Sequence, residues 1–474
     1  MSGEDGWSGI RLEELERAID GDVIVADTPA MDARPTPFNA RYDQTRPRAV
    51  VRCASGGDVA EAISFVRRHG LDSATRSGGH CFAGRSATSG LLIDVSPMRS
   101  VSVADGEVRI GAGATLGEVY VGLLPHGLTI PGGTCPSVGI AGLTLGGGLG
   151  LLGRAHGLTS DNLVRARIVL ADGRTIECDE HHDETLFWAL RGAGTGHFGV
   201  VTELVFRPVP IPMLATTFEL TWPFERAATV AEAWMAWSPF APDELAASLV
   251  IAAGPEPEVE PTVQVLGTML GTATDAREVL EGLVERAVSP ASGDVREMPY
   301  ADVLRHWGAR AGERLEDPRA TPAGRAAHFV KSEFFAGPLP AEAISALLAR
   351  LSDGRARGQT RELDFSPWGG AYNRIRPEAT AFVHRDPLFC LKHAAVVDAG
   401  SSATERAGCQ RWAAASWGTV HTWGTGGVFP NFPDPDLEDW GRAYYGWNLE
   451  RLLEVKAHYD PDTLFMFTQS LPPR

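Results

Sequence analysis

Short apolar runs and amphipathic stretches alternate through the first part of the chain, and they predict β-α-β units. Residues 49–53 are mostly apolar and predict a buried strand. Valine and isoleucine then recur every three to four residues within 59–66, which is typical of a helix with one buried face. Gly70 follows a basic last turn and indicates where that helix ends. Residues 74–75 lead directly into a glycine-rich loop, which therefore lies at a strand end.

A second unit repeats this order. Residues 108–110 predict a strand, and Thr115 with Glu118 has the spacing of a helix capping box. This helix is expected to end near Leu124, and residues 128–130 then lead into a second glycine-rich loop.

The rest of the first domain contains a hairpin, a helix and a strand. The hairpin covers residues 163–178, with its turn at an Ala-Asp-Gly sequence. Asp183 is the expected cap of a helix over 184–190, and residues 200–206 predict the closing strand. We expect the first domain to cover residues 1–210.

The pattern changes after this domain. From about 211 to 425, alternating strands such as 262–269 and 328–335 are separated by alanine-rich helices. This pattern predicts an antiparallel sheet with helices, so the fold class is α+β. The C-terminal segment, 426–474, is expected to hold a single helix over about 439–459.

Charge and composition narrow the possible partners. The 474 residues carry a formal net charge of −17, which argues against nucleic acid or an anionic membrane as the partner. No apolar stretch approaches the roughly 20 residues of a membrane span, and residues 1–10 do not resemble a signal peptide. Six cysteines show neither a disulfide framework nor a zinc-binding spacing, so no metal site is predicted. We expect a cytoplasmic protein, either a monomer or a homodimer.

The candidate chemistry lies in the two glycine-rich loops. The first runs from Arg76 to His80, and its consecutive glycines could form a nest for phosphate oxygens. The second, residues 131–139, carries Cys135 between two glycines and a proline, a poor context for core packing. Each loop alone is typical of a tight turn, and a histidine in a turn is more often an ordinary surface residue.

A third glycine motif, residues 194–199, matches the pattern GxGxxG. It follows a helix and precedes a strand, which is the reverse of the order in a dinucleotide-binding βαβ unit. A conventional nicotinamide site is therefore not predicted. These glycines instead allow backbone amides to contact another part of a cofactor.

Taken together, the motifs resemble one family. The two loops, residues 157–162 and 186–192, and the C-terminal run 444–452 are similar to the berberine bridge enzyme-like flavoproteins of the vanillyl-alcohol oxidase / p-cresol methylhydroxylase superfamily. The resemblance covers most of the chain. It implies a two-part FAD-binding domain of the vanillyl-alcohol oxidase type, completed by the C-terminal segment, and an α+β substrate domain.

The resemblance also implies how the cofactor is held. FAD would be covalently attached through its 8-methyl carbon to His80 and through C6 to Cys135, and two extra ring substituents are expected to raise its reduction potential. Val138 would occupy the position of an oxygen gate and favour reoxidation by dioxygen. The residues expected to bind the cofactor are Arg76, Ser77, Gly78, Gly79, His80, Cys135, Val138, Gly139, Gly142, Asp161, Gly196, Phe198, Gly199, Val200, Tyr445 and Asn448.

The substrate side departs from the family pattern. Relatives often carry a tyrosine base where this chain has Phe432, and glutamine or glutamate where it has Lys392. A lysine beside a flavin can act as a base if burial lowers its pKa, or can stabilise negative charge on reduced flavin. An ion-paired or exposed lysine is the alternative. Tyr372 is a possible replacement base.

The activity implied by the resemblance is that of an FAD-dependent oxidase. Hydride would pass to the flavin from a C–H bond next to oxygen or nitrogen of a small organic substrate, such as a natural product or carbohydrate, and dioxygen would yield hydrogen peroxide. Two alternatives remain open. One is redox-neutral or cyclising chemistry on the same scaffold, and the other is a flavin-binding protein that has lost catalysis.

Overall fold

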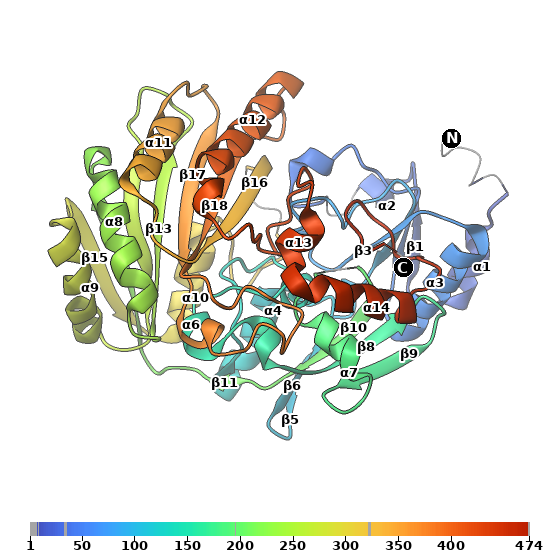
Figure 1. Cartoon of the computed structure of the whole chain (residues 1–474). Helices are drawn as coiled ribbons and strands as arrows, with labels where there is room; N and C mark the ends of the chain where they lie inside the picture. The colour runs from blue at the N-terminus through green and yellow to red at the C-terminus, as the bar shows by residue number, and fades with distance from the viewer. Residues whose placement is uncertain (1–6, 8, 33–35, 195, 321–323, 473–474) are drawn as a thin grey trace.

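The computed structural model describes residues 7, 9–32, 36–194, 196–320 and 324–472. Residues 1–6, on which part of the signal-peptide expectation falls, and Thr195 of the third glycine motif lie outside these ranges. Figure 1 shows two bodies side by side, one built around a large sheet and the other around the N-terminal strands and the C-terminal helices. Within the described residues, no helix combines the length and apolar character needed to cross a membrane. The expected α+β fold is confirmed.

The first sheet contains the predicted β-α-β unit. Its strands are β1 (Asp22–Val25), β2 (Ala49–Arg52), β4 (Leu91–Asp94) and β3 (Ser73–Arg76), in that spatial order. β2, β4 and β3 run parallel, and helix α3 (Gly56–His69) connects β2 to β3. Ser55 caps α3 by accepting a hydrogen bond from Asp58 N, and left-handed Gly70 ends it. The first glycine-rich loop begins where β3 ends.

The second sheet is antiparallel. Its strands, in spatial order, are β5 (Val101–Ala104), β6 (Glu107–Gly111), β10 (Gly199–Phe206), β8 (Leu163–Leu170) and β9 (Thr175–Asp179). Helix α4 (Leu116–Leu123) follows β6 and begins with the capping box expected for Thr115 and Glu118. A short pair, β7 (Leu128–Thr129) and β11 (Val209–Pro210), joins the ends of this region.

Asp183 does not cap its helix as expected. α7 (Glu184–Leu190) begins after this residue, but the Asp183 side chain makes no capping hydrogen bond. Its backbone is left-handed, with φ 47°, and its carboxylate accepts a hydrogen bond from Tyr459 Oη at 2.8 Å. The Asp183 side chain therefore binds Tyr459 of the C-terminal helix α14 instead of capping α7.

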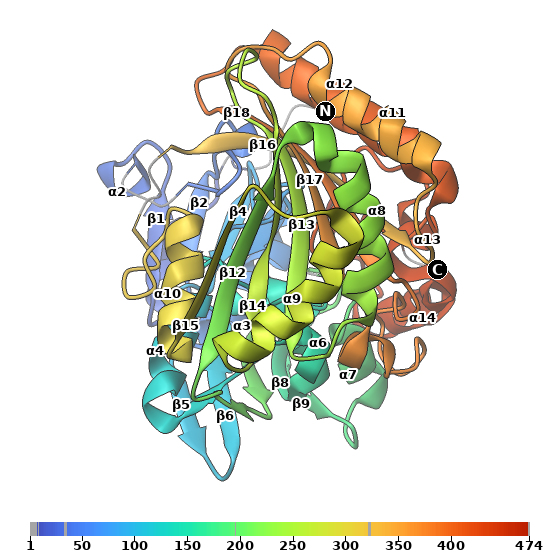
Figure 2. The same cartoon turned by 90° about the vertical axis from the view of Figure 1, so that its left-hand side faces the viewer.

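The third sheet has seven strands, all antiparallel. In spatial order they are β15 (Ser292–Met298), β12 (Ala215–Trp222), β14 (Thr262–Met269), β13 (Leu245–Ala253), β17 (Thr360–Pro367), β18 (Phe389–Asp398) and β16 (Ala326–Phe335). One face packs against helices α8 (Ala227–Trp237), α9 (Ala273–Ala287), α11 (Ala341–Ser352) and α12 (Ala403–Val420), as Figure 2 shows. Residues of β13 alternate between buried and half-buried, so the opposite face is free to line a cavity.

The C-terminal segment returns to the N-terminal half. The expected single helix is interrupted: α13 (Trp440–Tyr445) ends at Gly446, a 3-10 turn covers Gly446–Asn448, and α14 (Leu449–Tyr459) follows and packs on α7. Gly446 has φ 50°, and a side chain there would press on Val383 at 3.3 Å. The break lets the Asn448 side chain leave the helix axis and reach neighbouring backbone.

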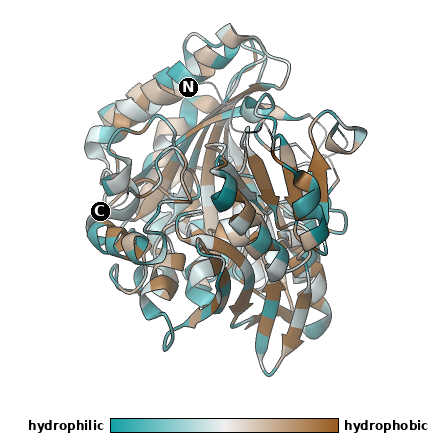
Figure 3. Ribbon diagram, turned by 90° about the vertical axis from the view of Figure 1, so that its right-hand side faces the viewer, coloured by the Kyte–Doolittle hydropathy of each residue, from teal (hydrophilic) through white to brown (hydrophobic). Residues whose placement is uncertain are grey.

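The remaining helices are short connections, except α10, which covers part of the cavity. They are α1 (Leu12–Ala18), α2 (Pro29–Asp32), α5 (Ile140–Leu145), α6 (Gly153–His156) and α10 (Tyr300–Arg310). Figure 3 shows hydrophobic strands inside and hydrophilic positions on the outer helices. The N-terminal core also includes residues of α10, α13 and α14, so the C-terminal segment is part of that core.

Candidate active site

A cavity of about 1260 Å³ lies between the N-terminal half and the open face of the seven-stranded sheet. The glycine-rich loops and residues 462–468 form one end of its wall. Side chains of β13, β14, β17 and β18 and residues 429–433 form another part. The volume suits a cofactor together with a small substrate, because single ligand pockets are typically about 300–1,000 Å³.

The two predicted loops meet through their backbones. A Cβ atom added at Gly78 would lie 2.3 Å from Gly139 N, and one added at Gly139 would lie 2.4 Å from Gly78 N. Real side chains do not fit at such separations, so both positions require glycine. Ser77 Oγ donates a hydrogen bond to Ala112 O at 2.7 Å and fixes the start of the first loop.

His80 and Cys135 therefore face one cavity, each from its own loop. The His80 ring stacks on Phe38 at 4.4 Å, and burial, with a smaller contribution from His328, lowers its pKa to about 4. Burial raises the pKa of Cys135 to about 11, and the nearby Glu313 carboxylate contributes to this rise. At neutral pH the site thus holds a neutral imidazole beside a protonated thiol.

Most of the residues expected to bind the cofactor lie on the cavity wall. They are Ser77, Gly78, Gly79, His80, Cys135, Val138, Gly139, Gly142, Gly196, Gly199 and Val200.

Arg76, Phe198, Tyr445 and Asn448 lie outside that lining and have partners within the protein. The Arg76 guanidinium donates to Ser86 O from two nitrogens, at 3.0 and 2.9 Å. Tyr445 Oη donates to Ala193 O at 2.7 Å, and Phe198 is buried in the N-terminal core. These residues support the loops that form the cavity wall. They were expected to contact the cofactor directly, and the structure instead gives them partners within the protein.

Asn448 is similar. Its side-chain amide donates to Pro377 O at 3.0 Å and to Thr380 O at 3.1 Å. It therefore secures the segment that precedes β18, from the C-terminal side of the molecule.

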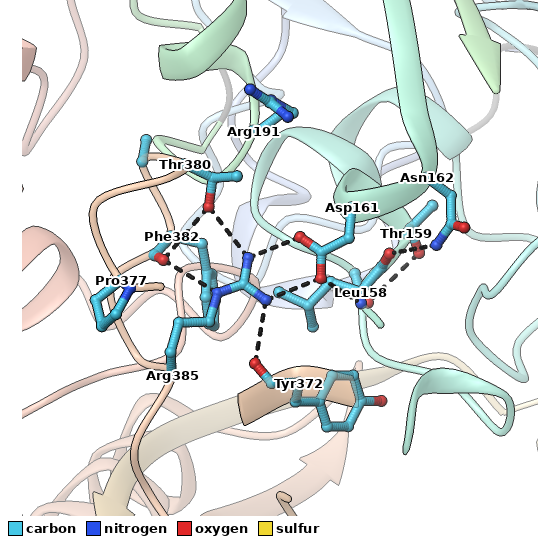
Figure 4. A network of polar contacts seen from close by, with 12 residues as sticks. Leu158, Thr159, Asp161, Asn162, Arg191, Tyr372, Pro377, Thr380, Phe382 and Arg385 are labelled. Carbon is cyan, nitrogen blue, oxygen red and sulfur yellow. Dashed lines mark hydrogen bonds and ion pairs between the residues drawn. The ribbon is translucent and has the colours of Figure 1, made fainter. Parts of the chain in front are cut away.

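Asp161 also has a different environment from the one expected. Figure 4 shows its carboxylate facing the Arg385 guanidinium, with Nη2–Oδ1 at 2.7 Å and Nη1–Oδ2 at 2.8 Å. Both side chains are almost fully buried, and Asp161 also accepts a hydrogen bond from Leu158 N at 2.8 Å. This pair joins the N-terminal half to the segment before β18.

Lys392 lies on the substrate side of the cavity between two carboxylates. Its Nζ is 2.9 Å from Asp364 Oδ2 and 3.1 Å from Glu362 Oε1, both on the neighbouring strand β17. Burial alone would lower the pKa of Lys392, but the two carboxylates outweigh burial and raise that pKa. The condition for a basic lysine is therefore not met, and the ion-paired alternative describes the residue.

Asp364 and Glu362 were not recognised from the sequence. With Ser366 they occupy alternate positions of β17, whose residues alternate between half-buried and buried. A period-two run of polar residues in a predicted strand was the signal that could have placed them on one face.

Tyr372 lines the cavity but is held in an aromatic cluster. Its ring stacks on Trp368 at 4.7 Å, and its hydroxyl donates to Gly150 O at 3.3 Å. Burial raises its pKa above the ordinary value for tyrosine. Phe432 stands in place of the usual tyrosine base, and the centroid of its ring lies 5.6 Å from Lys392 Nζ.

The residues present fit FAD. Among the described residues, Arg85 Nε and Ser86 Oγ are buried without a hydrogen-bond partner, and both residues line the cavity. Arg85 is oriented by Phe467, 4.9 Å from its guanidinium, and by Gln469 Oε1 at 3.0 Å. A cation with a free N–H, next to glycine backbone, suits a diphosphate. Arg85 was not recognised from the sequence.

Comparisons with known proteins agree with this geometry. A family model described as an FAD binding domain matches residues 47–179, and one described as berberine and berberine like matches residues 428–472. The fold and the glycine-lined cavity thus define an FAD-binding flavoprotein.

Relatives of full length support a narrower class. An FAD-linked oxidoreductase of Bacillus subtilis, YgaK, is 33% identical over 462 residues, covering 96% of this chain and 97% of its own. A chitooligosaccharide oxidase of Gibberella zeae is 30% identical, and the match covers 93% of this chain and 90% of that enzyme. The structure of an Acremonium strictum glucooligosaccharide oxidase, described as revealing a novel flavinylation, has a TM-score of 0.87 at 25% identity, covering 98% and 99%. The chain belongs to the berberine bridge enzyme-like family of FAD-linked oxidoreductases.

Proposed function

We propose that this protein is an oxidase whose FAD is covalently attached to both His80 and Cys135. The observation that carries this proposal is that both side chains face one cavity from loops in backbone contact. Bound FAD would accept hydride at N5 and return the electrons to dioxygen, giving hydrogen peroxide. The flavinylation described for the Acremonium strictum enzyme supports a covalent cofactor.

Lys392 is the proposed positive charge beside the flavin. In the flavin ring, C6 is bonded to the carbon that carries N5, so a flavin linked to Cys135 would have N5 close to that link. Burial and Glu313 raise the pKa of the Cys135 thiol, and the positive charge of Lys392 acts on the same thiol and offsets part of that rise. Since its two carboxylate partners favour the ammonium form, Lys392 can stabilise negative charge on reduced flavin.

Asp364 is the residue we propose as the proton acceptor. Phe432 cannot accept a proton, and the Tyr372 hydroxyl is bound to Gly150 O with a raised pKa. Asp364 lies on the cavity wall, where Lys392 and Ser366 donate hydrogen bonds to its two oxygens. A carboxylate oriented in this way can take the proton of a substrate hydroxyl or amine as hydride leaves.

The substrate would be a small organic molecule with a C–H bond next to oxygen or nitrogen. Ala246, Ser248 and Val250 face the cavity from β13 with small side chains, which leaves room above the carboxylates. Val138 lines the cavity next to Cys135, where a small aliphatic side chain leaves dioxygen access. The oligosaccharide oxidases among the relatives make carbohydrates the first class to test.

Acid precipitation tests the cofactor attachment. We expect the wild-type protein and the single variants His80→Ala and Cys135→Ala to retain yellow flavin in the pellet, and the double variant to release it. Cys81→Ala is the matched control, because Cys81 is a free thiol on the same cavity wall. Acid-stable flavin in the double variant, or complete release from the wild type, would rule out the proposed links.

Peroxide detection tests the oxidase activity. Sugars, amines and alcohols would be screened for anaerobic bleaching of the flavin, and air would then be admitted. One equivalent of peroxide per oxidised product is expected. An isomeric product without peroxide would instead support the redox-neutral alternative.

A further inference from the structure

A carboxylate from the loop after α10 reaches the loop that carries Cys135. Glu313 follows α10, and both of its oxygens bind Ser137, two residues after Cys135. Oε1 lies 2.6 Å from Ser137 Oγ, and Oε2 accepts a hydrogen bond from Ser137 N at 2.7 Å. Ser137 Oγ is in turn 2.8 Å from His80 Nε2. Glu313, Ser137 and His80 thus form a continuous chain of hydrogen bonds.

The direction of each proton in this chain follows from the groups involved. An ionised carboxylate is an acceptor only, so the single hydroxyl proton of Ser137 points to Glu313. Ser137 Oγ must then accept from His80, which places the imidazole proton on Nε2. Since burial lowers the pKa of His80 to about 4, the ring is neutral at pH 7 and Nδ1 carries the lone pair.

We propose that Ser137 and Glu313 are positioning residues for cofactor attachment, holding His80 in the tautomer whose Nδ1 bonds to the 8-methyl carbon of the flavin. This inference rests on the proposed histidyl link. Phe38 completes the arrangement, because its stacking at 4.4 Å fixes the plane of the imidazole. Glu313 lies on a loop between α10 and β16, so a segment far along the chain from both glycine-rich loops contributes to building the cofactor site.

The attachment balances with dioxygen as the oxidant. A bond forms between His80 Nδ1 and the 8-methyl carbon, and one C–H bond of that methyl group breaks. The imidazole loses its Nε2 proton to Ser137, whose own hydroxyl proton passes toward Glu313. The two electrons released pass through the flavin ring to dioxygen, which takes up the methyl proton and the imidazole proton and becomes hydrogen peroxide.

The test uses Cys135→Ala as the parent, so that His80 is the only proposed link. Ser137→Ala and Glu313→Gln are added to this parent, each protein is incubated with excess FAD in air, and acid-stable flavin and intact mass are followed over time. Glu316→Gln is the matched control, because Glu316 lies on the same loop but pairs with Arg305. Ser137→Thr retains a hydroxyl and serves as the conservative variant. Flavin bound without a covalent link reports whether each variant is folded.

We expect Ser137→Ala and Glu313→Gln to slow formation of the link by about 10²-fold, the usual contribution of a positioned proton acceptor. Ser137→Thr and Glu316→Gln should link at the rate of the parent. If folded Ser137→Ala and Glu313→Gln proteins link as fast as the parent, the positioning role is overturned while the histidyl link stands. A parent that never forms acid-stable flavin would overturn the link itself.

Discussion

Three charged side chains meet beside the cavity, where Lys392 and Asp364 lie on the wall and Glu362 pairs with Lys392. Their balance determines what each can do. Lys392 is within ion-pair distance of Asp364 and Glu362, and all three are partly shielded from water by the surrounding sheet. Shielding strengthens the interaction of opposite charges and makes an unpaired charge costly. The lysine is therefore a fixed cation, and Asp364, the carboxylate on the cavity wall, is the one that we propose as the proton acceptor.

Replacing these residues separates their roles. Lys392→Met should slow anaerobic flavin reduction by about 10²-fold, because it removes a positive charge where negative charge develops. Reoxidation by dioxygen should change far less. Stopped-flow absorbance of the flavin measures both steps.

Asp364→Asn should also slow anaerobic flavin reduction, because asparagine cannot accept the substrate proton. Any dependence of the reduction rate on an ionised carboxylate should then be lost. Arg310→Met is a suitable control, because Arg310 pairs with Glu219 outside the cavity lining. If the flavin of Lys392→Met is reduced as fast as that of the wild type, Lys392 serves only as a structural ion pair.

At the scale of elements, local signals were predictable and tertiary ones were not. The capping box of Thr115 and Glu118 and the end of α3 at Gly70 depend on neighbours within four residues, and both are confirmed. The helix break at Gly446 and the contact of Asp183 with Tyr459 depend on partners more than 60 residues away in the chain. Sequence periodicity contains no information about such partners.

The segment before β18 shows the same limit. From the sequence, residues 380–386 of this segment match the family pattern. In the structure, Arg385 of this segment forms the buried ion pair with Asp161, and Asn448 binds the same segment from the C-terminal side. Conventional loop signals do not reveal a buried charge pair.

Breaking this pair should be strongly destabilising. Arg385→Met leaves the Asp161 carboxylate buried without its partner, which typically costs about 3–5 kcal/mol. Arg376→Met is the matched control, since Arg376 pairs with Glu378 in water and such pairs contribute about 1 kcal/mol or less. Urea unfolding followed by circular dichroism gives both values. Equal losses in the two variants would show that the buried pair is not a structural link.

At the scale of the molecule, the site is assembled from distant parts of the chain. Ser137 and Glu313 are 176 residues apart, and His80 meets Ser137 from the other loop. The motifs indicated His80, Cys135 and the FAD class, but not the wall that faces them, because strand order is not encoded in periodicity. The division at residues 210 and 425 stays a prediction.

Buried neutral histidines should make the whole molecule sensitive to acid. Burial lowers the pKa of His328 and His384 to about 4 and that of His393 to about 3, against 6.5 for an ordinary histidine. Between pH 6.5 and 4 the unfolded chain therefore binds more protons than the folded one, so stability is present above pH 6.5 and is lost as pH falls. Three such groups contribute up to about 4 kcal/mol per pH unit near pH 5.

One variant tests this effect directly. His393 is fully buried with Nδ1 2.9 Å from Ser416 Oγ, and His393→Gln retains a polar group without a titratable ring. The free energy of unfolding, measured in urea at pH 7, 6 and 5, should fall less steeply in this variant, by about 1.4 kcal/mol per pH unit. The same substitution at His181 is the matched control, because that side chain is exposed. If His393→Gln and the wild type lose stability in parallel, the histidine is already protonated in the folded protein, and burial of a neutral ring is not the source of the acid sensitivity.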